Sequence, residues 1–299
     1  MVLESGLEEL AQIVDRLVPE GKTQFQRGPV WVCRSYAPTV PAPALYIPML
    51  CVVATGAKEL LLGDERHVYA AGRFLLNSVA VPASGGVLEA SPARPCLWTM
   101  LELDPALIAS VVMGAGHSPS LEAAPMSTLG LGALQTTILD PLLRLVRLLE
   151  SPEDFEFLAP LAMREIVYRL LQTDQAPRLH QIVASGGRTG RVLRAVEWLR
   201  DNYARPMAID DLARECGLSP SALHHNFKDV TEMSPLRYQK QLRLQEARRL
   251  MVGEGLDAAA AGHRVGYDDA SHFSREYRRF FGAPPRRDAK RIQGDGVTS

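Results

Sequence analysis

Long apolar runs, paired cysteines and a secretory leader are all missing from this sequence of 299 residues. No apolar run approaches the ~20 residues that a membrane-spanning helix requires, so we expect no membrane segment. The N-terminal MVLESGLEEL has no basic start followed by an apolar core, so we expect no secretory signal. The four cysteines lie far apart without a CxxC pair: Cys33, Cys51, Cys96 and Cys216. This spacing favours buried, reduced thiols in a cytoplasmic protein over disulfides or a cysteine zinc site.

Motifs of nucleotide-binding and metal-dependent enzymes are also missing. The sequence has no phosphate-binding loop of the GxxxxGKS or GxxxxGKT type, and no GxGxxG on a strand-to-helix turn. A metal-dependent β-barrel enzyme needs two histidines and a carboxylate at close spacing, but the β-rich region holds only His67, with His117 beyond it. Because His67 lies in the charged segment DERH, we expect it to be solvated. We therefore expect no catalytic residue, no metal and no cofactor.

Charge is unevenly divided along the chain, although the total is only −1. Residues 186–299 hold 20 Lys and Arg against 15 Asp and Glu, a net charge of +5, and residues 1–185 hold 13 against 19, a net charge of −6. A basic C-terminal third suggests an anionic partner. The excess is small for a non-specific architectural DNA-binding protein, because such proteins neutralise many phosphates.

Residues 24–103 are predicted to be rich in strands. Short apolar runs such as VWVC, MLCVV and LLL are separated by Gly and Pro. The segment KELLLGDERHVYAAGRFLLNS predicts three strands joined by turns at Gly63-Asp64 and at Gly72, as in a sandwich or barrel. An apolar barrel interior suits a small-molecule pocket. Five residues are candidates to line it, although ordinary core packing is the more frequent role for each: Tyr36, Tyr46, Cys51, Trp98 and Met100.

Residues 134–172 are predicted to form two amphipathic helices. Apolar residues recur there at spacings of three and four. The first helix carries Leu134, Ile138, Leu142, Leu145 and Leu149, and the second carries Leu158, Leu161, Ile166, Leu170 and Leu171. Such a pair either covers the β-domain or forms the seam of a homodimer, and the pattern fits both.

Residues 212–235 and 261–285 repeat one pattern of helix, glycine turn and helix. Gly217 corresponds to Gly266, and beyond the turn a shift of 50 residues aligns the two copies. The aligned apolar pairs are Leu223 with Phe273, Phe227 with Tyr277, and Val230 with Phe280; Pro235 aligns with Pro285. Each second helix therefore has one buried face.

The opposite face of each second helix is free of carboxylates. It carries Ser221, His224, His225 and Lys228 in the first copy, and Ser271, Ser274, Arg275 and Arg278 in the second. A helix that enters the major groove needs hydrogen-bond donors and short polar groups there. The helix-turn-helix motif has this arrangement. Two helical hairpins with solvated faces are the alternative, but two matched copies favour DNA binding.

A third amphipathic helix is predicted between the two copies, over SPLRYQKQLRLQEARRLMVG. A helix of ~17 residues spans ~25 Å. Acting as a strut, it would hold the two recognition helices ~34 Å apart, which is one turn of B-DNA. We therefore expect the two motifs to contact successive major grooves.

The stretch from Val192 to Arg291 resembles the C-terminal domain of AraC/XylS-type transcriptional regulators. The matching motifs are LARECGLSPSALHHNFK, SPLRYQKQLRLQEARRLM and VGYDDASHFSREYRRFFGAPP. The segment LYIPMLCVVATGAKELLLGDERHVYAAGRFLLNSVAVPASGGVLEASPARP resembles the N-terminal effector domain of one subgroup. The resemblance implies an α+β fold, with a cupin-like β-barrel, a helical extension and an all-α domain of two helix-turn-helix motifs joined by a long helix. We expect domains over residues 1–180 and 191–299, with a linker over 181–190.

The resemblance also assigns the DNA contacts. In the first recognition helix they fall on Ser221, His224 and His225, with Lys228 near phosphate; in the second they fall on Ala270, Ser271, His272, Ser274 and Arg275. Two departures from the family pattern stand out. Gly262 replaces the usual alanine, at a cost of about 1 kcal/mol of helix stability, and His224 and His225 replace longer side chains.

The resemblance implies a transcriptional activator, with duplex DNA, RNA polymerase, a small-molecule effector and a second copy of the chain as partners. A different class is an enzyme fused to DNA-binding helices, such as a cysteine-dependent DNA repair methyltransferase. That enzyme would need an activated cysteine, and no cysteine here has a His or Cys within four residues.

Overall fold

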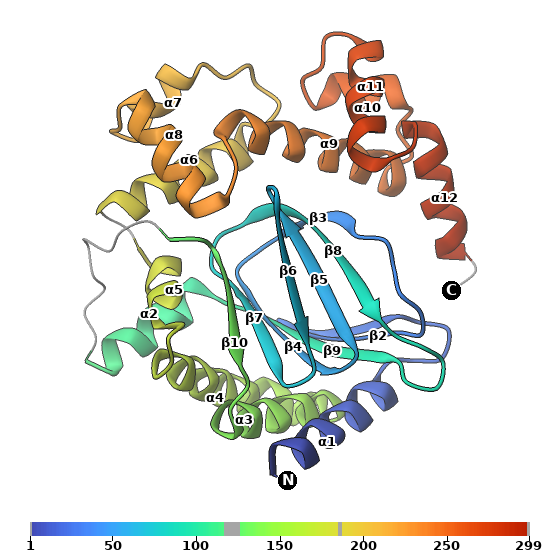
Figure 1. Ribbon diagram of the computed structural model, residues 1–299, viewed down its shortest axis with the longest axis vertical. Coiled ribbons are helices and arrows are strands. Elements are labelled where there is room, and N and C mark those ends of the chain that lie inside the picture. The colour runs from blue at the N-terminus through green and yellow to red at the C-terminus, as the bar shows by residue number, and fades with distance from the viewer. Residues whose placement is uncertain (1, 117–125, 185–186, 298–299) are drawn as a thin grey trace.

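The computed structural model describes residues 2–116, 126–184 and 187–297. Helix α1 (Val2–Leu17) is followed by a β-domain, and helices make up the rest of the chain (Figure 1). The strands are β1 (Gln24–Arg27), β2 (Val30–Ser35), β3 (Ala42–Tyr46), β4 (Met49–Thr55), β5 (Ala57–Leu62), β6 (Glu65–Ala70), β7 (Arg73–Asn77), β8 (Val81–Glu89), β9 (Cys96–Glu102) and β10 (Leu129–Ala133). Helix α2 (Pro105–Gly114) lies between β9 and β10. His117 falls outside the described residues.

Two antiparallel sheets form the barrel. One has the order β1-β2-β9-β4-β7-β10 and the other β3-β8-β5-β6. Alternate residues of β4 point to opposite sides of its sheet: Leu50 and Val52 contact the helices, whereas Cys51 and Val53 belong to the core between the two sheets. Because both faces are covered, β4 is buried along nearly its whole length. The cupin-like α+β fold expected from the sequence is confirmed.

The two turns predicted around β6 are confirmed. Leu62 pairs with Glu65, which leaves Gly63 and Asp64 as a two-residue hairpin loop. Gly63 has a φ of 60° and Gly72, between β6 and β7, a φ of 79°; a side chain disfavours both values. The hairpin β5–β6 therefore turns tightly at Gly63-Asp64 and forms one side of the four-stranded sheet, in which β5 also pairs with β8.

Helices α3 (Thr136–Arg147) and α4 (Pro152–Leu171), joined by a short 3₁₀ turn (Leu148–Glu150), pack with α1 against the outer face of the six-stranded sheet. The leucine ladder of the first predicted helix lies in this core, with each side chain at most 3% exposed: Leu134, Ile138, Leu142, Leu145 and Leu149. For these five residues the covering role is confirmed and the dimer-seam interpretation is wrong. Instead, α4 exposes another apolar set: Phe157, Leu158, Leu161 and Tyr168.

The C-terminal part is entirely helical within the described residues. After α5 (Ala176–Ile182) it contains α6 (Gly187–Asp201), α7 (Ile209–Glu215), α8 (Pro220–Thr231), α9 (Pro235–Gly253), α10 (Ala258–Arg264), α11 (Ala270–Phe281) and α12 (Pro285–Val297). Helices α5 and α6 extend into the two ends of the expected linker over 181–190, and the domain boundaries stay a prediction. None of the helices described here is both long and apolar enough to cross a membrane.

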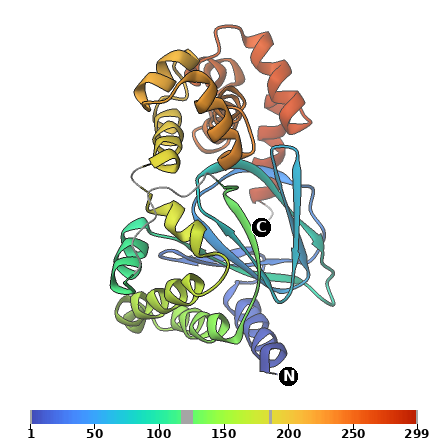
Figure 2. The same cartoon turned by 60° about the vertical axis from the view of Figure 1, so that its left-hand side comes forward.

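The C-terminal helices lie on one side of the barrel, opposite α1, α3 and α4 (Figures 1 and 2). The first helix-turn-helix motif shares one continuous apolar core with the barrel interior, in which Val53 and Leu60 belong with Phe227 and Tyr238. The Tyr238 hydroxyl donates to the Ala80 carbonyl at 2.7 Å. The second motif has a separate core around Phe273 and Tyr277.

Candidate nucleic-acid interface

Both predicted helix-turn-helix motifs are present. The turns contain Gly217 (φ 64°) and Gly266 (φ 91°). A Cβ on Gly266 would lie 2.1 Å from the Ala204 carbonyl oxygen, so only glycine fits there. The recognition helices α8 and α11 begin at the N-caps Ser219 and Asp269, whose side chains accept hydrogen bonds from backbone amides.

The inner faces of the two recognition helices are buried as the spacing predicts. Leu223, Phe227 and Val230 of α8 are fully buried, and so are Phe273 and Tyr277 of α11. Phe280 is only partly buried and packs at the edge of the second core. The faces that point away from these residues are therefore fixed in orientation.

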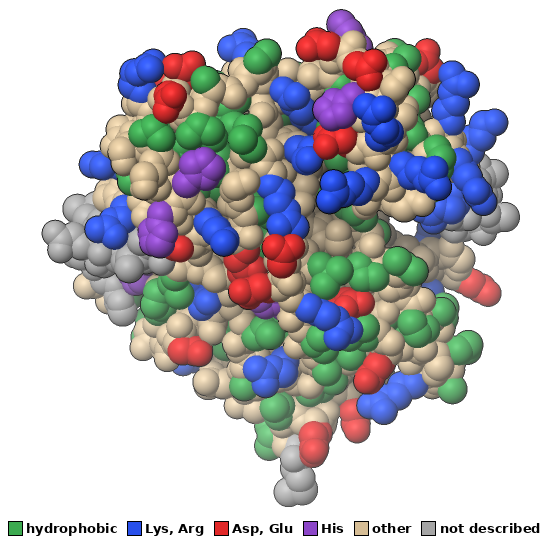
Figure 3. Space-filling view, turned by 45° about the horizontal axis from the view of Figure 1, so that its top comes forward, with side chains coloured by type: hydrophobic (Ala, Val, Ile, Leu, Met, Phe, Trp, Pro, Cys, Tyr) green, Lys and Arg blue, Asp and Glu red, His purple; other side chains and the backbone are tan. Residues whose placement is uncertain are grey.

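The outer faces of α8 and α11 are open to solvent. All but one of the proposed contact residues are exposed, and Ser274 is half-buried: Ser221, His224, His225, Lys228, Ala270, Ser271, His272, Ser274, Arg275 and Arg278. In Figure 3, Lys, Arg and His side chains are spread over the helical domain, with carboxylates among them. The assignment of individual side chains to bases or phosphates stays a prediction.

The carboxylates near these faces differ in placement. Glu276 turns toward α9, where it accepts from Lys240 at 2.8 Å and from the Tyr267 hydroxyl at 3.1 Å. Asp229, however, lies 3.4 Å from His225 on α8. Glu276 also lies 3.9 Å from His272. The expectation that the acids stand apart from the proposed contact residues is therefore wrong at both positions, because residues four apart on a helix are neighbours.

Asp288 on α12 is a supporting residue that sequence reasoning missed. Its side chain is fully buried and joins three helices. It accepts from the Tyr277 hydroxyl of α11 at 2.9 Å, from Nη2 of Arg248 on α9 at 3.2 Å, and from Arg291 at 2.9 Å. Burial and the Asp288 charge raise the pKa of Tyr277, so its hydroxyl stays protonated and donates. This network fixes the second recognition helix on the strut α9.

Gly262 on α10 departs from the family pattern for a visible reason. A Cβ at this position would lie 2.9 Å from the Phe273 ring. Phe273 is fully buried, so its ring has little room to move. The glycine therefore gives up some helix stability in exchange for close packing of α10 against α11.

Four of the five candidate effector-pocket residues lie together in the barrel. Cys51 belongs to the interior core, and Tyr46, Trp98 and Met100 pack against it. Tyr36 does not join them: it is 48% exposed and lies against the Arg34 guanidinium. Its assignment as a lining residue is therefore wrong.

Lys58 is an interior cation that sequence reasoning missed. Its Nζ lies 3.5 Å from the centre of the Trp98 ring. Lys58 is two residues from Leu60 and four from Leu62, which both face the interior, so the two-residue period of β5 was the available signal. Burial raises the thiol pKa of Cys33 to about 12 and that of Cys96 to about 11. The positive charge of Lys58 lowers both pKa values, but by less than burial raises them.

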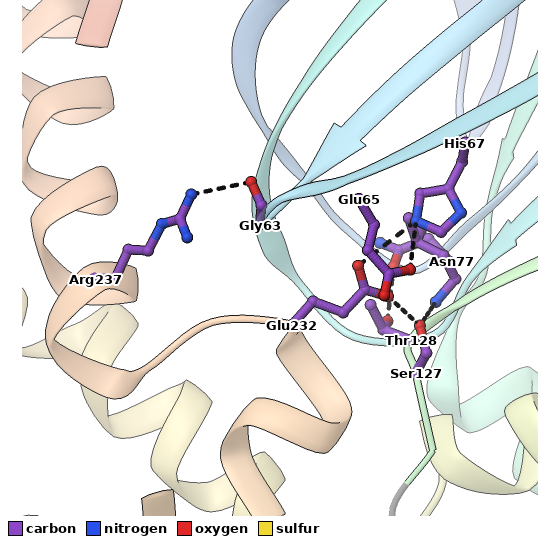
Figure 4. Close-up of polar contacts among 9 residues, drawn as sticks. Gly63, Glu65, His67, Asn77, Ser127, Thr128, Glu232 and Arg237 are labelled. Atoms are coloured by element: carbon purple, nitrogen blue, oxygen red, sulfur yellow. Dashed lines mark hydrogen bonds and ion pairs between the residues drawn. The ribbon is translucent and has the colours of Figure 1, made fainter. Parts of the chain in front are cut away.

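His67 is not solvated, contrary to the sequence-based expectation. Its side chain is 17% exposed because the β5–β6 hairpin packs against the helical domain. Nε2 of His67 lies 3.5 Å from the carboxylate of Glu232, the residue that ends α8. At the hairpin turn, Arg237 of α9 donates to the Gly63 carbonyl at 3.0 Å (Figure 4). Arg237 also contacts the Asp64 carboxylate at 3.1 Å.

The fold and the two helix-turn-helix motifs define a two-domain DNA-binding protein. Residues 28–178 match the family model of the AraC-type transcriptional regulator N-terminus, and residues 212–291 match a helix-turn-helix domain model. The first match covers half of the chain. The chain belongs to the AraC-type transcriptional regulators.

Curated relatives agree with this membership. The HTH-type transcriptional activator RhaS of Escherichia coli is 31% identical over 151 residues, which is 50% of this chain and 54% of the relative. The chain thus spans about half the length of the curated relatives it matches.

Solved structures show the same fold. An apo variant of ToxT from Vibrio cholerae superposes with a TM-score of 0.58 at 10% identity, over 88% of this chain and 98% of that chain. ToxT with a bound unsaturated fatty acid gives a TM-score of 0.53 at 11% identity, over 91% and 97%. At this identity the likeness concerns the fold alone.

Proposed function

We propose that this regulator binds a specific operator through the outer faces of α8 and α11, in successive major grooves. The observation that carries the proposal is the repeated, solvent-exposed polar face on two recognition helices joined by a 19-residue helix, α9. At 1.5 Å per residue α9 is about 28 Å long, close to one turn of B-DNA. Selection of binding sites from random duplexes by the full chain tests the proposal, and two conserved half-sites about one helical turn apart are the expected result.

Arg275 and Lys228 are expected to contribute in different ways. Arg275→Ala should weaken specific binding by about 1–3 kcal/mol and relax the preference at one base pair. This is the usual effect of removing an arginine that hydrogen-bonds to a guanine. Lys228→Ala should weaken binding to all sequences, because one phosphate contact is lost. The slope of the logarithm of the binding constant against the logarithm of the salt concentration should become less steep by about one. Binding to an operator and to its single-base variants at several salt concentrations measures both effects.

Arg144→Ala is the matched control for these two variants, because it removes an exposed arginine from α3 on the opposite side of the barrel. It should leave DNA binding unchanged. If Arg275→Ala discriminates among bases as well as the wild type does, Arg275 is not a base contact.

The domain boundary leads to a further expectation. We propose that residues 191–299 form the DNA-binding unit and residues 1–180 the effector unit, with a linker between them. A fragment of residues 186–299 should retain specific binding, because both recognition helices, α9 and the Asp288 network lie within it. Gel-shift assays against selected and random duplexes measure this; equal affinity for both would contradict the proposed boundary.

The barrel interior is proposed to hold the effector. Tyr46, Cys51, Trp98 and Met100 would supply an apolar and aromatic lining, and Lys58 would add one positive charge. These features suit a small apolar molecule with an anionic group. The fatty acid bound by ToxT has this character, which supports the effector class proposed for this chain.

The remaining partners are proposed from the family. RhaS is named as an activator, so we propose that this chain activates transcription in the cytoplasm together with RNA polymerase. We also propose that the chain is not an enzyme. An alkyl-accepting cysteine would need a thiolate, whereas burial holds the Cys33 and Cys96 thiols protonated. Incubation with alkylated DNA should transfer no alkyl group to the protein.

A further inference from the structure

Three side chains with metal-binding atoms meet where the barrel contacts the end of the first recognition helix. Glu65 and His67 come from β6 and Glu232 from the C-terminus of α8, and their donor atoms all lie within 4.8 Å of one another. Nε2 of His67 is 3.5 Å from Oε2 of Glu232 and 3.9 Å from Oε2 of Glu65. Figure 4 shows the Glu232 carboxylate pointing at the other two side chains.

Glu232 has an unusual backbone conformation, for which the internal repeat provides a comparison. It is the only non-glycine residue with positive φ in the described part of the chain, at 59°. The repeat aligns it with Gly282, which ends α11 at a φ of 78°. Glycine adopts this conformation freely, whereas any other residue pays of order 1–3 kcal/mol. The first motif therefore keeps a glutamate where the fold prefers glycine, which is consistent with a role for its side chain.

The polar atoms at the centre of this cluster lack hydrogen bonds. The Glu232 side chain is nine-tenths buried, yet among the described residues Oε2 of Glu232 and Nε2 of His67 have no hydrogen-bond partner. A buried carboxylate oxygen without a partner is costly. A positive charge from another element acts on this carboxylate, because Glu232 attracts the Arg178 guanidinium of α5.

The surroundings hold Glu232 in position. The Ser127 hydroxyl donates to Oε1 of Glu232, which leaves Oε2 free to face His67. The Thr128 amide donates to the Val230 carbonyl at 3.0 Å, and the Thr128 hydroxyl donates to Asn77 at 2.8 Å. Such outer contacts typically orient the side chains that coordinate metals. On the open side, Glu65 is 69% exposed, so an ion can enter from solvent.

We propose that Glu65, His67 and Glu232 bind one divalent transition-metal ion that joins the barrel to the first recognition helix. Two donors bound to the same tetrahedral ion at ~2.1 Å lie ~3.4 Å apart. The His67–Glu232 distance of 3.5 Å already matches this spacing, and the exposed Glu65 side chain needs to move only slightly. A water molecule would complete the four-coordinate shell.

The donor set selects the class of ion. An imidazole nitrogen with two carboxylates suits Zn²⁺ and its transition-metal neighbours, whereas Ca²⁺ and Mg²⁺ prefer oxygen alone. Two carboxylates and a neutral imidazole carry a charge of about −2, which a divalent ion neutralises. The cysteines do not compete for the ion, since all four are buried away from this cluster as free thiols.

Zinc binding to untagged, full-length, chelator-treated protein tests the proposal. Competition with a chromogenic chelator should show one tight Zn²⁺ per chain. His67→Ala and Glu232→Gln should each lower the Zn²⁺ affinity by at least the ~10–100-fold typical of losing an outer contact. At 100-fold excess over the wild-type dissociation constant, Zn²⁺ should raise the wild-type melting temperature by about 4 °C, and at the same concentration it should raise that of these variants by less than about half as much.

Two further variants separate loss of the ion from loss of the fold. Glu232→Gly installs the residue found at the equivalent position of α11, so the chain should fold and yet bind no zinc. His263→Ala removes an exposed histidine of α10 and should bind zinc as the wild type does. The proposal is overturned if the wild type binds neither Zn²⁺ nor Co²⁺, or if His67→Ala or Glu232→Gly retains wild-type affinity.

Discussion

Asp288→Ala is expected to destabilise the second helix-turn-helix motif by about 3–5 kcal/mol, the usual cost of removing one partner from a buried ion pair. The variant leaves Arg248, whose side chain is 17% exposed, without the carboxylate that it contacts at 2.9 Å. The Tyr277 hydroxyl loses its acceptor at the same time. Denaturant unfolding of the full chain, followed by circular dichroism, measures the loss.

Asp211→Ala is the control for this prediction, because it removes an exposed carboxylate that pairs with Arg214 on α7. Exposed pairs contribute only about 0–1 kcal/mol, so the control should unfold nearly as the wild type does. An Asp288→Ala variant that matched this control would show that α12 does not hold α11 in place. DNA binding should reveal the same difference, with the half-site contacted by α11 losing its base preference.

Self-association is expected to depend on the exposed face of α4. We propose that the chain forms a homodimer through Phe157, Leu158, Leu161 and Tyr168, which α4 leaves in contact with solvent. Sedimentation at micromolar concentration should show a dimer for the wild type. Phe157→Glu combined with Leu161→Glu should give a folded monomer, because charges enter the seam without touching the core.

Leu142→Glu should have a different effect, since Leu142 is fully buried beneath α4. Placing a carboxylate there is expected to cost more than about 4 kcal/mol and to unfold the β-domain. A wild type that sediments as a single species of 32.8 kDa would refute the dimer. A dimer that survives the Phe157 and Leu161 substitutions would place the seam on another surface.

Local patterns in the sequence predicted much of the fold. The two-residue period and the glycine turns located β5, β6 and β7, and the shift of 50 residues aligned α8 with α11. These features succeed because period and turn chemistry act between near neighbours in the chain. The same reasoning explains why the sequence could not decide whether Leu142 and its neighbours cover the β-domain or form a dimer seam. The spacing of apolar residues defines an apolar face of the helix, but it does not identify what packs against that face.

Contacts between distant segments were beyond such patterns. His67 and Glu232 are separated by 165 residues, so no spacing rule connects them. No local pattern marks Asp288 as buried, because its partners Tyr277 and Arg248 come from α11 and α9. Tyr36 directly follows β2, which ends at Ser35. The sequence pattern does not show where this strand ends, so it could not predict that the Tyr36 side chain turns to solvent.

The barrel and the first helix-turn-helix motif share one core, so the two recognition helices differ in how closely they are coupled to the barrel. Because α8 packs into the same apolar cluster as Leu60 and Val53, its stability in the full chain is coupled to the barrel, whereas α11 packs in its own core at the far end of α9. A ligand that tightens the barrel would thus act on one half-site and leave the other nearly untouched. We therefore expect an operator of this protein to carry one half-site whose occupancy responds to the ligand and one whose occupancy does not.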